Sequence, residues 1–150
     1  MRLQPTALFA AALFASVAAS ARISTFEILD QSAYGRFADT EFVRIDARVT
    51  GQLERTENIF AIDRARANAK GSVEYTTRVL LIIPAKRANG TLVVEVPNRG
   101  REISHALYNG FRDPPTPLGD MSPGNGFLQR NGFALAAVTW EYGEGIASDV

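Results

Sequence analysis

Four consecutive residues, Asn98, Arg99, Gly100 and Arg101, follow the largely apolar segment Leu92-Val-Val-Glu-Val96 and are the strongest candidates for chemistry in this chain. Because glycine adopts backbone angles that a side chain forbids, a sharp turn here can direct backbone N–H groups toward a ligand. Such donors stabilise the negative oxygen that develops during acyl transfer. We therefore interpret the four residues as a candidate oxyanion loop. The alternative is an ordinary turn at the end of a strand.

Acyl transfer also requires a nucleophile and a base, and the sequence identifies neither. His105 is the only histidine, and its neighbour Ser104 is a poor partner because adjacent side chains point in different directions in a helix or a strand. The motifs Gly-x-Ser-x-Gly and His-Glu-x-x-His do not occur. Three late acidic residues, Glu141, Glu144 and Asp149, are expected in a solvated loop. We predict no catalytic residue, no metal site and no cofactor.

The candidate loop must be positioned by the elements on either side of it. The segment that begins at Thr91 predicts a buried strand, and residues Gly126–Arg130 predict a short helix that ends at Asn131-Gly132. The apolar run Ala134–Val138 predicts a second buried strand. A strand, a helix and a strand in this order are typical of a right-handed crossover between parallel strands.

Two earlier segments also predict strands. Residues 42–50 alternate between apolar and polar side chains, which is typical of a strand that is solvated on one face. Residues 73–83 alternate at first and then become continuously apolar, so this strand starts at the surface and ends in the interior. Residues 51–71 between them predict a loop with at most one helical turn. Together the four strands imply a mixed sheet.

The first 21 residues predict a signal peptide. Arg2 precedes an apolar run from Ala7 to Ala18, and Ala19-Ser20-Ala21 matches the small-residue pattern of a cleavage site. The alternative is an uncleaved anchor, but the run of about a dozen residues is shorter than the roughly 20 that span a bilayer. We therefore expect an exported protein, periplasmic or secreted, with residues 22–150 as one domain and no integral membrane span after cleavage.

Composition excludes several classes of function. Sixteen Lys and Arg balance sixteen Asp and Glu, so the sequence does not predict the basic surface that nucleic acids require. The chain has no cysteine, which excludes disulfides, a thiol nucleophile and zinc sites built from thiolates. Nucleic acid is therefore not an expected partner.

Three motifs occur in order along the chain: Asn68-Ala-Lys-Gly71 with Val73-Glu-Tyr-Thr-Thr77, then Gly90-Thr-Leu with Glu95-Val-Pro-Asn-Arg-Gly100, and finally Gly124-Asn-Gly-Phe-Leu-Gln-Arg-Asn-Gly132 before a strand and Trp140. With this order, the chain from about Thr40 onward resembles the N-terminal part of exported bacterial proteins described as alpha/beta hydrolase domain-containing. The resemblance implies the fold class α/β. Residues 22–150 would then be the N-terminal portion of an α/β hydrolase type mixed sheet, incomplete because the chain ends before the nucleophile.

The resemblance also implies a function for a longer parent protein. That function is hydrolysis of an ester-type bond in a small molecule, with Asn98 to Arg101 as the oxyanion loop and the catalytic triad in later residues. Other hydrolases of this type carry a His-Gly motif at this position, whereas this chain has Asn98-Arg99-Gly100.

In the family's sheet order, the last predicted strand lies between the strands that contain Val79 and Thr91. The far edge of the Thr91 strand is covered by a later strand that this chain would lack. An apolar strand with an open edge pairs readily with other chains, so we expect the segment to self-associate. The alternative function is a noncatalytic, exported, β-rich module that binds a ligand or a partner.

Overall fold

The computed structural model describes residues 22–96, 101–110, 116–117 and 121–139. Residues 1–21, which include the expected signal peptide, lie outside these ranges, as do Asn98, Arg99 and Gly100 of the candidate oxyanion loop. The acidic residues Glu141, Glu144 and Asp149 also lie outside them.

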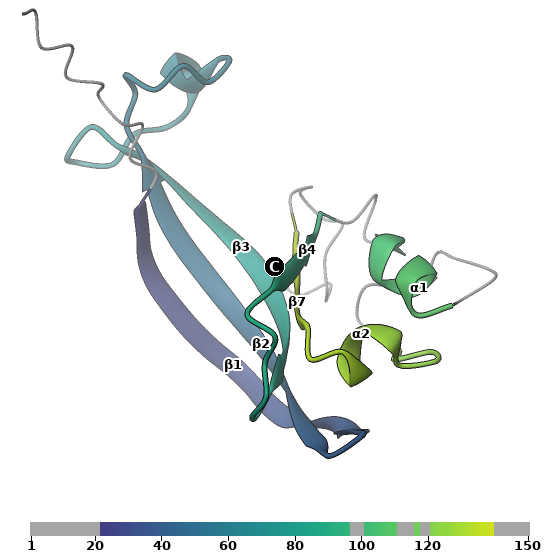
Figure 1. The fold of residues 1–150 in the computed structure, drawn as a ribbon. Helices are drawn as coiled ribbons and strands as arrows, with labels where there is room; N and C mark the ends of the chain where they lie inside the picture. Colours follow the sequence, from purple (N-terminus) through teal and green to yellow (C-terminus); the bar gives the residue numbers. More distant parts are fainter. Residues whose placement is uncertain (1–21, 97–100, 111–115, 118–120, 140–150) are drawn as a thin grey trace, which may run out of the picture.

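The described chain is built on one mixed sheet of five strands (Figure 1). In spatial order the strands are β1 (Arg22–Phe37), β2 (Thr40–Leu53), β3 (Val73–Pro84), β7 (Ala134–Val138) and β4 (Leu92–Glu95). β1, β2, β3 and β7 pair antiparallel with one another, whereas β7 and β4 pair in parallel. The predictions of a mixed sheet and of a last strand between the strand that contains Val79 and the strand that follows Thr91 are therefore confirmed.

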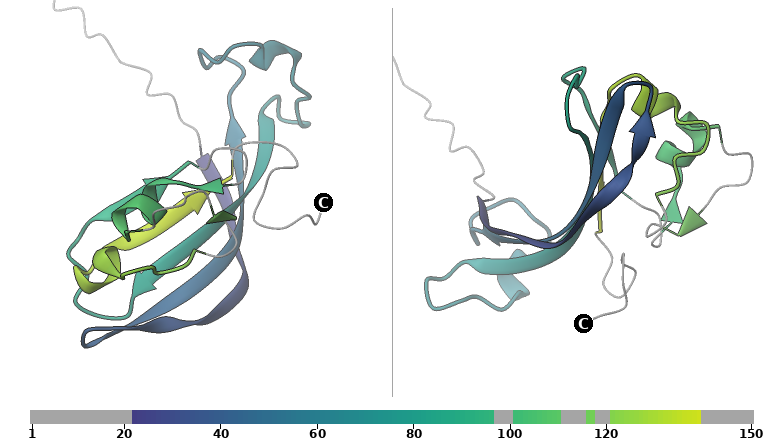
Figure 2. Two further views of the ribbon diagram at one scale, coloured as in Figure 1. Left: turned by 90° about the vertical axis from the view of Figure 1, so that its right-hand side faces the viewer. Right: turned by 90° about the horizontal axis from the view of Figure 1, so that it is seen from below.

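Helices contribute little to the structure. They are α1 (Ser104–Tyr108), α2 (Phe127–Arg130) and the 3-10 turn η1 (Ile62–Arg64), and a second small sheet pairs β5 (Arg101–Glu102) with β6 (Thr116–Pro117). α1 and α2 both lie on the same side of the large sheet (Figure 2). The predicted single turn between residues 51 and 71 is present as η1.

The fold class expected from the resemblance, an α/β hydrolase type sheet, is wrong. Strands make up 52% of the structure and helices 12%, so the chain is mostly β. An α/β sheet needs helices that cover both of its faces. Helices of five and four residues on one side cannot provide that cover. The long antiparallel strands β1, β2 and β3 dominate instead (Figure 1).

A cluster of buried hydrophobic residues lies between the sheet and the connection that contains α1 and α2. Leu80 and Ile82 of β3 and Leu135 of β7 are fully buried and pack against Leu128 of α2. Phe42 of β2 closes this cluster. Burial of such side chains contributes about 1.5–3 kcal/mol each.

Both faces of β2 contribute buried residues: Phe42 lies on the helix-covered face, and Ala47 and Val49 lie on the opposite face. Leu80 pairs with Asp46, and Ile82 pairs with Arg44, so the helix-covered face of the sheet carries the charged residues of β2. Asp46 is half-buried there and accepts two hydrogen bonds of 2.8 Å from the Arg78 guanidinium. The ion pair allows the polar face of β2 to continue into the core.

The opposite side of the sheet, here called the open face, carries apolar side chains from every strand. No described helix lies on it (Figure 2). Register places these residues on the open face: Phe26 and Ile28 of β1, Val43, Ile45, Ala47 and Val49 of β2, Val79, Leu81 and Ile83 of β3, Ala134, Ala136 and Val138 of β7, and Leu92 and Val94 of β4.

The connection into β7 is formed as the sequence predicts. α2 ends at Arg130, Asn131 is its C-cap, and Gly132 adopts a left-handed φ of 74°. A Cβ at Gly132 would lie 2.8 Å from the carbonyl oxygen of Arg87, so close packing also requires glycine here.

Candidate functional site

Glu95, the last residue of β4, joins the end of that strand to the start of α1. Its carboxylate is buried and accepts backbone hydrogen bonds from Ile103 (2.5 Å) and Ser104 (2.9 Å) through Oε1, and from His105 (3.0 Å) through Oε2. The first N–H groups of a helix have no partner within the helix and carry partial positive charge. A carboxylate from a distant strand therefore caps α1, whose own N-cap residue Ile103 makes no side-chain hydrogen bond to it.

His105 lies beside this carboxylate and is completely buried. Its Nε2 is 3.3 Å from the carbonyl oxygen of Val93. A carbonyl can only accept, so Nε2 carries the hydrogen and the neutral ring presents a lone pair at Nδ1. Nδ1 has no hydrogen-bond partner in the described structure and lies 3.5 Å from Oε2 of Glu95 and 3.7 Å from Oε1 of Glu102.

Burial lowers the pKa of His105 below its ordinary value, because an imidazolium loses solvation in the interior. The negative charge of Glu95 and the hydrogen bond to Val93 act in the opposite direction but do not reverse the shift. The imidazole is therefore mostly neutral at pH 7. Glu95, Glu102 and His105 are all buried, and one donor atom from each lies within 4.8 Å of the others.

Of the four candidate oxyanion residues, the structure describes only Arg101. It is exposed, and it lies in β5, where it pairs with Pro117 of β6. The N–H groups of residues 103–105 already donate to Glu95, so α1 cannot offer them to a ligand. Donors for an oxyanion would therefore have to come from residues before Ile103.

The cluster of Glu95, Glu102 and His105 was not predicted from the sequence. His105 was a candidate only as a base for Ser104, whereas the ring nitrogens face Val93 and the two carboxylates. Two signals were available. Glu95 is the only charged residue in an otherwise apolar run, and Glu102 and His105 have the i, i+3 spacing that brings side chains together.

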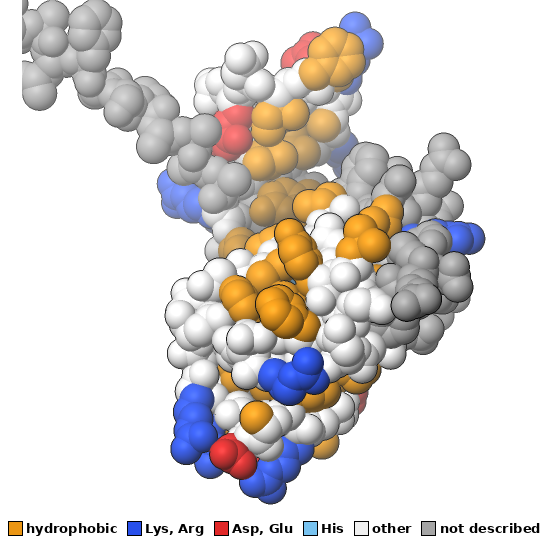
Figure 3. Space-filling model, turned by 45° about the vertical axis from the view of Figure 1, so that its right-hand side comes forward, with side chains coloured by type: hydrophobic (Ala, Val, Ile, Leu, Met, Phe, Trp, Pro, Cys, Tyr) orange, Lys and Arg blue, Asp and Glu red, His pale blue; other side chains and the backbone are white. Residues whose placement is uncertain are grey.

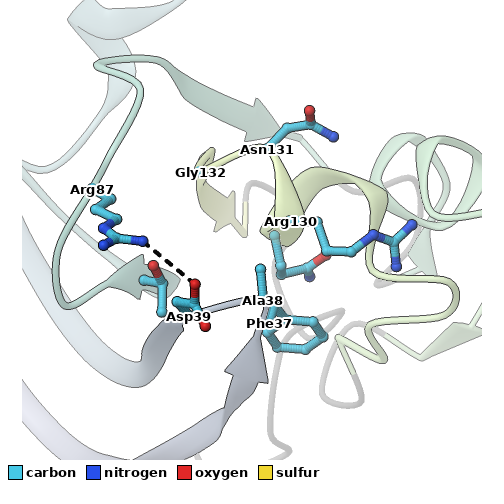
Figure 4. Close-up of a pocket in the computed structure, with 9 residues that line it drawn as sticks. Phe37, Ala38, Asp39, Arg87, Arg130, Asn131 and Gly132 are labelled. Atoms are coloured by element: carbon cyan, nitrogen blue, oxygen red, sulfur yellow. Dashed lines mark ion pairs between the residues drawn. The ribbon is translucent and has the colours of Figure 1, made fainter.

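A shallow pocket of about 220 Å³ lies at the other end of β4 and β7. Figure 4 shows the ion pair of Arg87 and Asp39 (3.7 Å) within it, with the Arg130 side chain extending away from that pair. Both partners of the ion pair are largely exposed, so solvent screens their interaction. The lining residues are Phe37, Ala38, Asp39, Thr40, Arg87, Gln129, Arg130, Asn131 and Gly132.

Hydrophobic side chains also gather on the surface, both in the middle of the molecule and along the long strands (Figure 3). Leu92 and Val94 of β4 are each 53% exposed, and Leu107 and Tyr108 of α1 are exposed as well. β4 is the last strand in the described sheet order. Its exposed apolar residues therefore lie on an edge strand.

Comparison with known proteins identifies no relative of this chain: no family model, no curated protein and no solved structure matches it. Among the described residues, no helix has the length and apolar character needed to cross a membrane.

Proposed function

We propose that this chain takes part in ester-type acyl hydrolysis in an exported protein. In this proposal, residues 98–101 form the oxyanion loop, and a nucleophile outside these 150 residues attacks the ester. The three ordered sequence motifs that resemble exported hydrolases support the proposal. The observation that carries it is the anchoring of both sides of the loop by Glu95, whose carboxylate binds the start of α1.

An oxyanion loop must hold its donors in place before the reaction begins. Glu95 precedes the loop and Ile103 follows it, and the hydrogen bond between them limits how far its two ends can separate. The same carboxylate also accepts hydrogen bonds from the backbone N–H groups of Ser104 and His105.

The position of the loop also favours ligand binding. β4 and β7 run in parallel, and Glu95 lies at the carboxyl end of β4. Where parallel strands end, connections leave the sheet and form ligand sites at that edge. The shallow pocket lies at the opposite, amino end of these strands, and Glu95 is not among its lining residues.

Removal of a loop N–H tests the proposal in the protein encoded by the complete natural reading frame. Gly100→Pro removes one backbone donor, and we expect it to lower kcat for 4-nitrophenyl butyrate by about 10²–10³-fold, as loss of one oxyanion donor does elsewhere. Phe60→Ala is the control, because Phe60 is 98% exposed and lies in the loop between β2 and β3, and its kcat should stay near the wild-type value.

Two results would contradict this function. One is a complete reading frame whose product does not hydrolyse the ester, and the other is an unchanged kcat in Gly100→Pro. The 150-residue chain alone should give no turnover above background. Turnover by this chain that a serine-directed phosphonate abolishes would show that its nucleophile lies within the sequence.

The open face and the edge strand support a second candidate function, a noncatalytic interaction module whose partner is a second copy of this chain. No described strand pairs with the outer edge of β4, and an unpaired edge offers backbone donors and acceptors to another strand. The sequence has no net charge, so electrostatic repulsion between copies is weak.

A lysine on this edge should weaken self-association. We expect Val94→Lys to shift the chain from oligomer toward monomer in sedimentation velocity, because a charge on an edge strand opposes pairing. Ile59→Lys is the control, since Ile59 is exposed but lies in the loop between β2 and β3. A wild-type chain that is monomeric at all concentrations would exclude this second function.

A further inference from the structure

We infer that Glu95, Glu102 and His105 form a binding site for a divalent transition-metal ion, for which Zn²⁺ is the appropriate probe. This site is distinct from the proposed oxyanion loop and does not depend on ester hydrolysis. Its donor set consists of one imidazole nitrogen and two carboxylate oxygens. Zn²⁺ accepts both kinds of donor, and the formal charge of two carboxylates matches a divalent cation.

The unpartnered nitrogen of His105 is the first evidence for a ligand. Nδ1 is fully buried and has no hydrogen bond to any residue that the structure describes, although buried polar atoms almost always have a partner. Because Nε2 donates to the carbonyl of Val93, the free lone pair at Nδ1 faces the carboxylates of Glu95 and Glu102. Nδ1 and one oxygen of each carboxylate lie within 4.8 Å of one another, so a single cation between them could contact all three.

The distances between donor atoms are the second line of evidence. The separations of 3.5 Å and 3.7 Å from Nδ1 to the carboxylate oxygens exceed the usual range of a hydrogen bond. Two ligands bound to Zn²⁺ at 2.0–2.1 Å in a tetrahedral arrangement lie about 3.3–3.4 Å apart. Shifts of a few tenths of an ångström would therefore bring Nδ1 and either oxygen into coordinating positions.

The contacts around the donors match those of metal sites. A histidine that binds a metal usually donates its other ring N–H to a carbonyl or carboxylate, and Nε2 of His105 faces the carbonyl of Val93. Carboxylate ligands are usually hydrogen-bonded as well, and Glu95 accepts three backbone hydrogen bonds. Its Oε2 accepts only one of these, from the His105 N–H, and so keeps a lone pair for a metal.

A metal ion here would connect three elements. Glu95 ends β4, Glu102 ends β5, and His105 lies in the first turn of α1. The ion would hold them together on both sides of residues 97–100. Because it would bind the folded chain in preference to the unfolded chain, it would also raise stability.

The test compares Zn²⁺ binding by the full chain and by two variants. The buried site requires refolding from urea after removal of metals with EDTA, followed by dialysis and addition of ZnCl₂. We expect one Zn²⁺ per chain, a Kd below about 10 μM and a higher Tm. Glu102→Gln should weaken binding by about 10- to 100-fold or more, whereas the exposed control Glu41→Gln should leave it unchanged.

The single histidine provides a second readout that does not depend on any variant. In ¹⁵N NMR spectra of the wild-type imidazole, Zn²⁺ should shift the Nδ1 resonance while Nε2 remains protonated. A protonated Nδ1 that Zn²⁺ does not affect would overturn the inference, because the cluster would then be an ion pair between an imidazolium and carboxylates. Zn²⁺ binding that Glu102→Gln does not weaken would also overturn it.

Discussion

Substitution of Glu95 by glutamine is expected to lower the free energy of unfolding by about 2–4 kcal/mol, because it neutralises a buried acceptor of three backbone hydrogen bonds. Glutamine has nearly the same shape but offers one carbonyl oxygen and an NH₂ group. That NH₂ group would face N–H donors at the start of α1. Urea unfolding in the presence of EDTA measures this effect without any contribution from bound metal.

Glu41→Gln is the matched control for Glu95→Gln. The substitution is chemically the same, but both side chains of the Glu41–Arg36 ion pair (3.5 Å) are largely exposed. Exposed ion pairs contribute little, so we expect a change within about 0.5 kcal/mol. A loss in Glu95→Gln no larger than that of the control would show that the carboxylate does not hold α1.

Phe42→Ala is expected to lower the free energy of unfolding by about 3–5 kcal/mol, the usual cost of removing a buried aromatic ring. Phe42 is 1% exposed and closes the cluster formed by β3, β7 and α2. Its ring also packs edge to face against the ring of Phe37, with 5.6 Å between the ring centroids. The substitution would leave a cavity where the sheet meets the helix-bearing connection, and urea unfolding would measure its cost.

The control for Phe42→Ala uses the same substitution on the surface. Phe60 is 98% exposed, so Phe60→Ala should change stability by no more than about 0.5 kcal/mol. A loss below about 1 kcal/mol in Phe42→Ala would contradict the position of the core.

Local patterns predicted several elements correctly. The alternation of β2, the apolar end of β3 and the C-cap at Asn131-Gly132 all depend on near neighbours in the sequence. β1 was not predicted, and its pairing with β2 shifts register at three places, after Ile23, Ile28 and Ala33. Each shift interrupts the period-two pattern by which a strand is recognised.

The fold class was wrong because it depended on the resemblance to α/β hydrolases, whose sheets carry helices on both faces. The helices that the structure describes lie on one side of the sheet (Figure 2). The register of the strands leaves apolar residues on the open face. Sequence periodicity indicates that a strand is apolar on both sides, but it does not show what covers each side.

The cluster at the end of β4 could not be derived from spacing alone. Glu102 and His105 are close in sequence, but Glu95 reaches them only because the connection folds back on β4. A lone glutamate in an apolar run was a signal of a buried partner. The identity of that partner depends on tertiary structure.

Both the proposed oxyanion loop and the proposed metal site require that Glu95 hold the start of α1. Amide hydrogen exchange of Ile103, Ser104 and His105 tests this requirement most directly. We predict that these three amides are protected in the wild-type chain and that Glu95→Gln increases their exchange rates relative to core amides of β3. Exchange at the rate of an unstructured peptide in the wild type, or rates that Glu95→Gln leaves unchanged, would contradict the account.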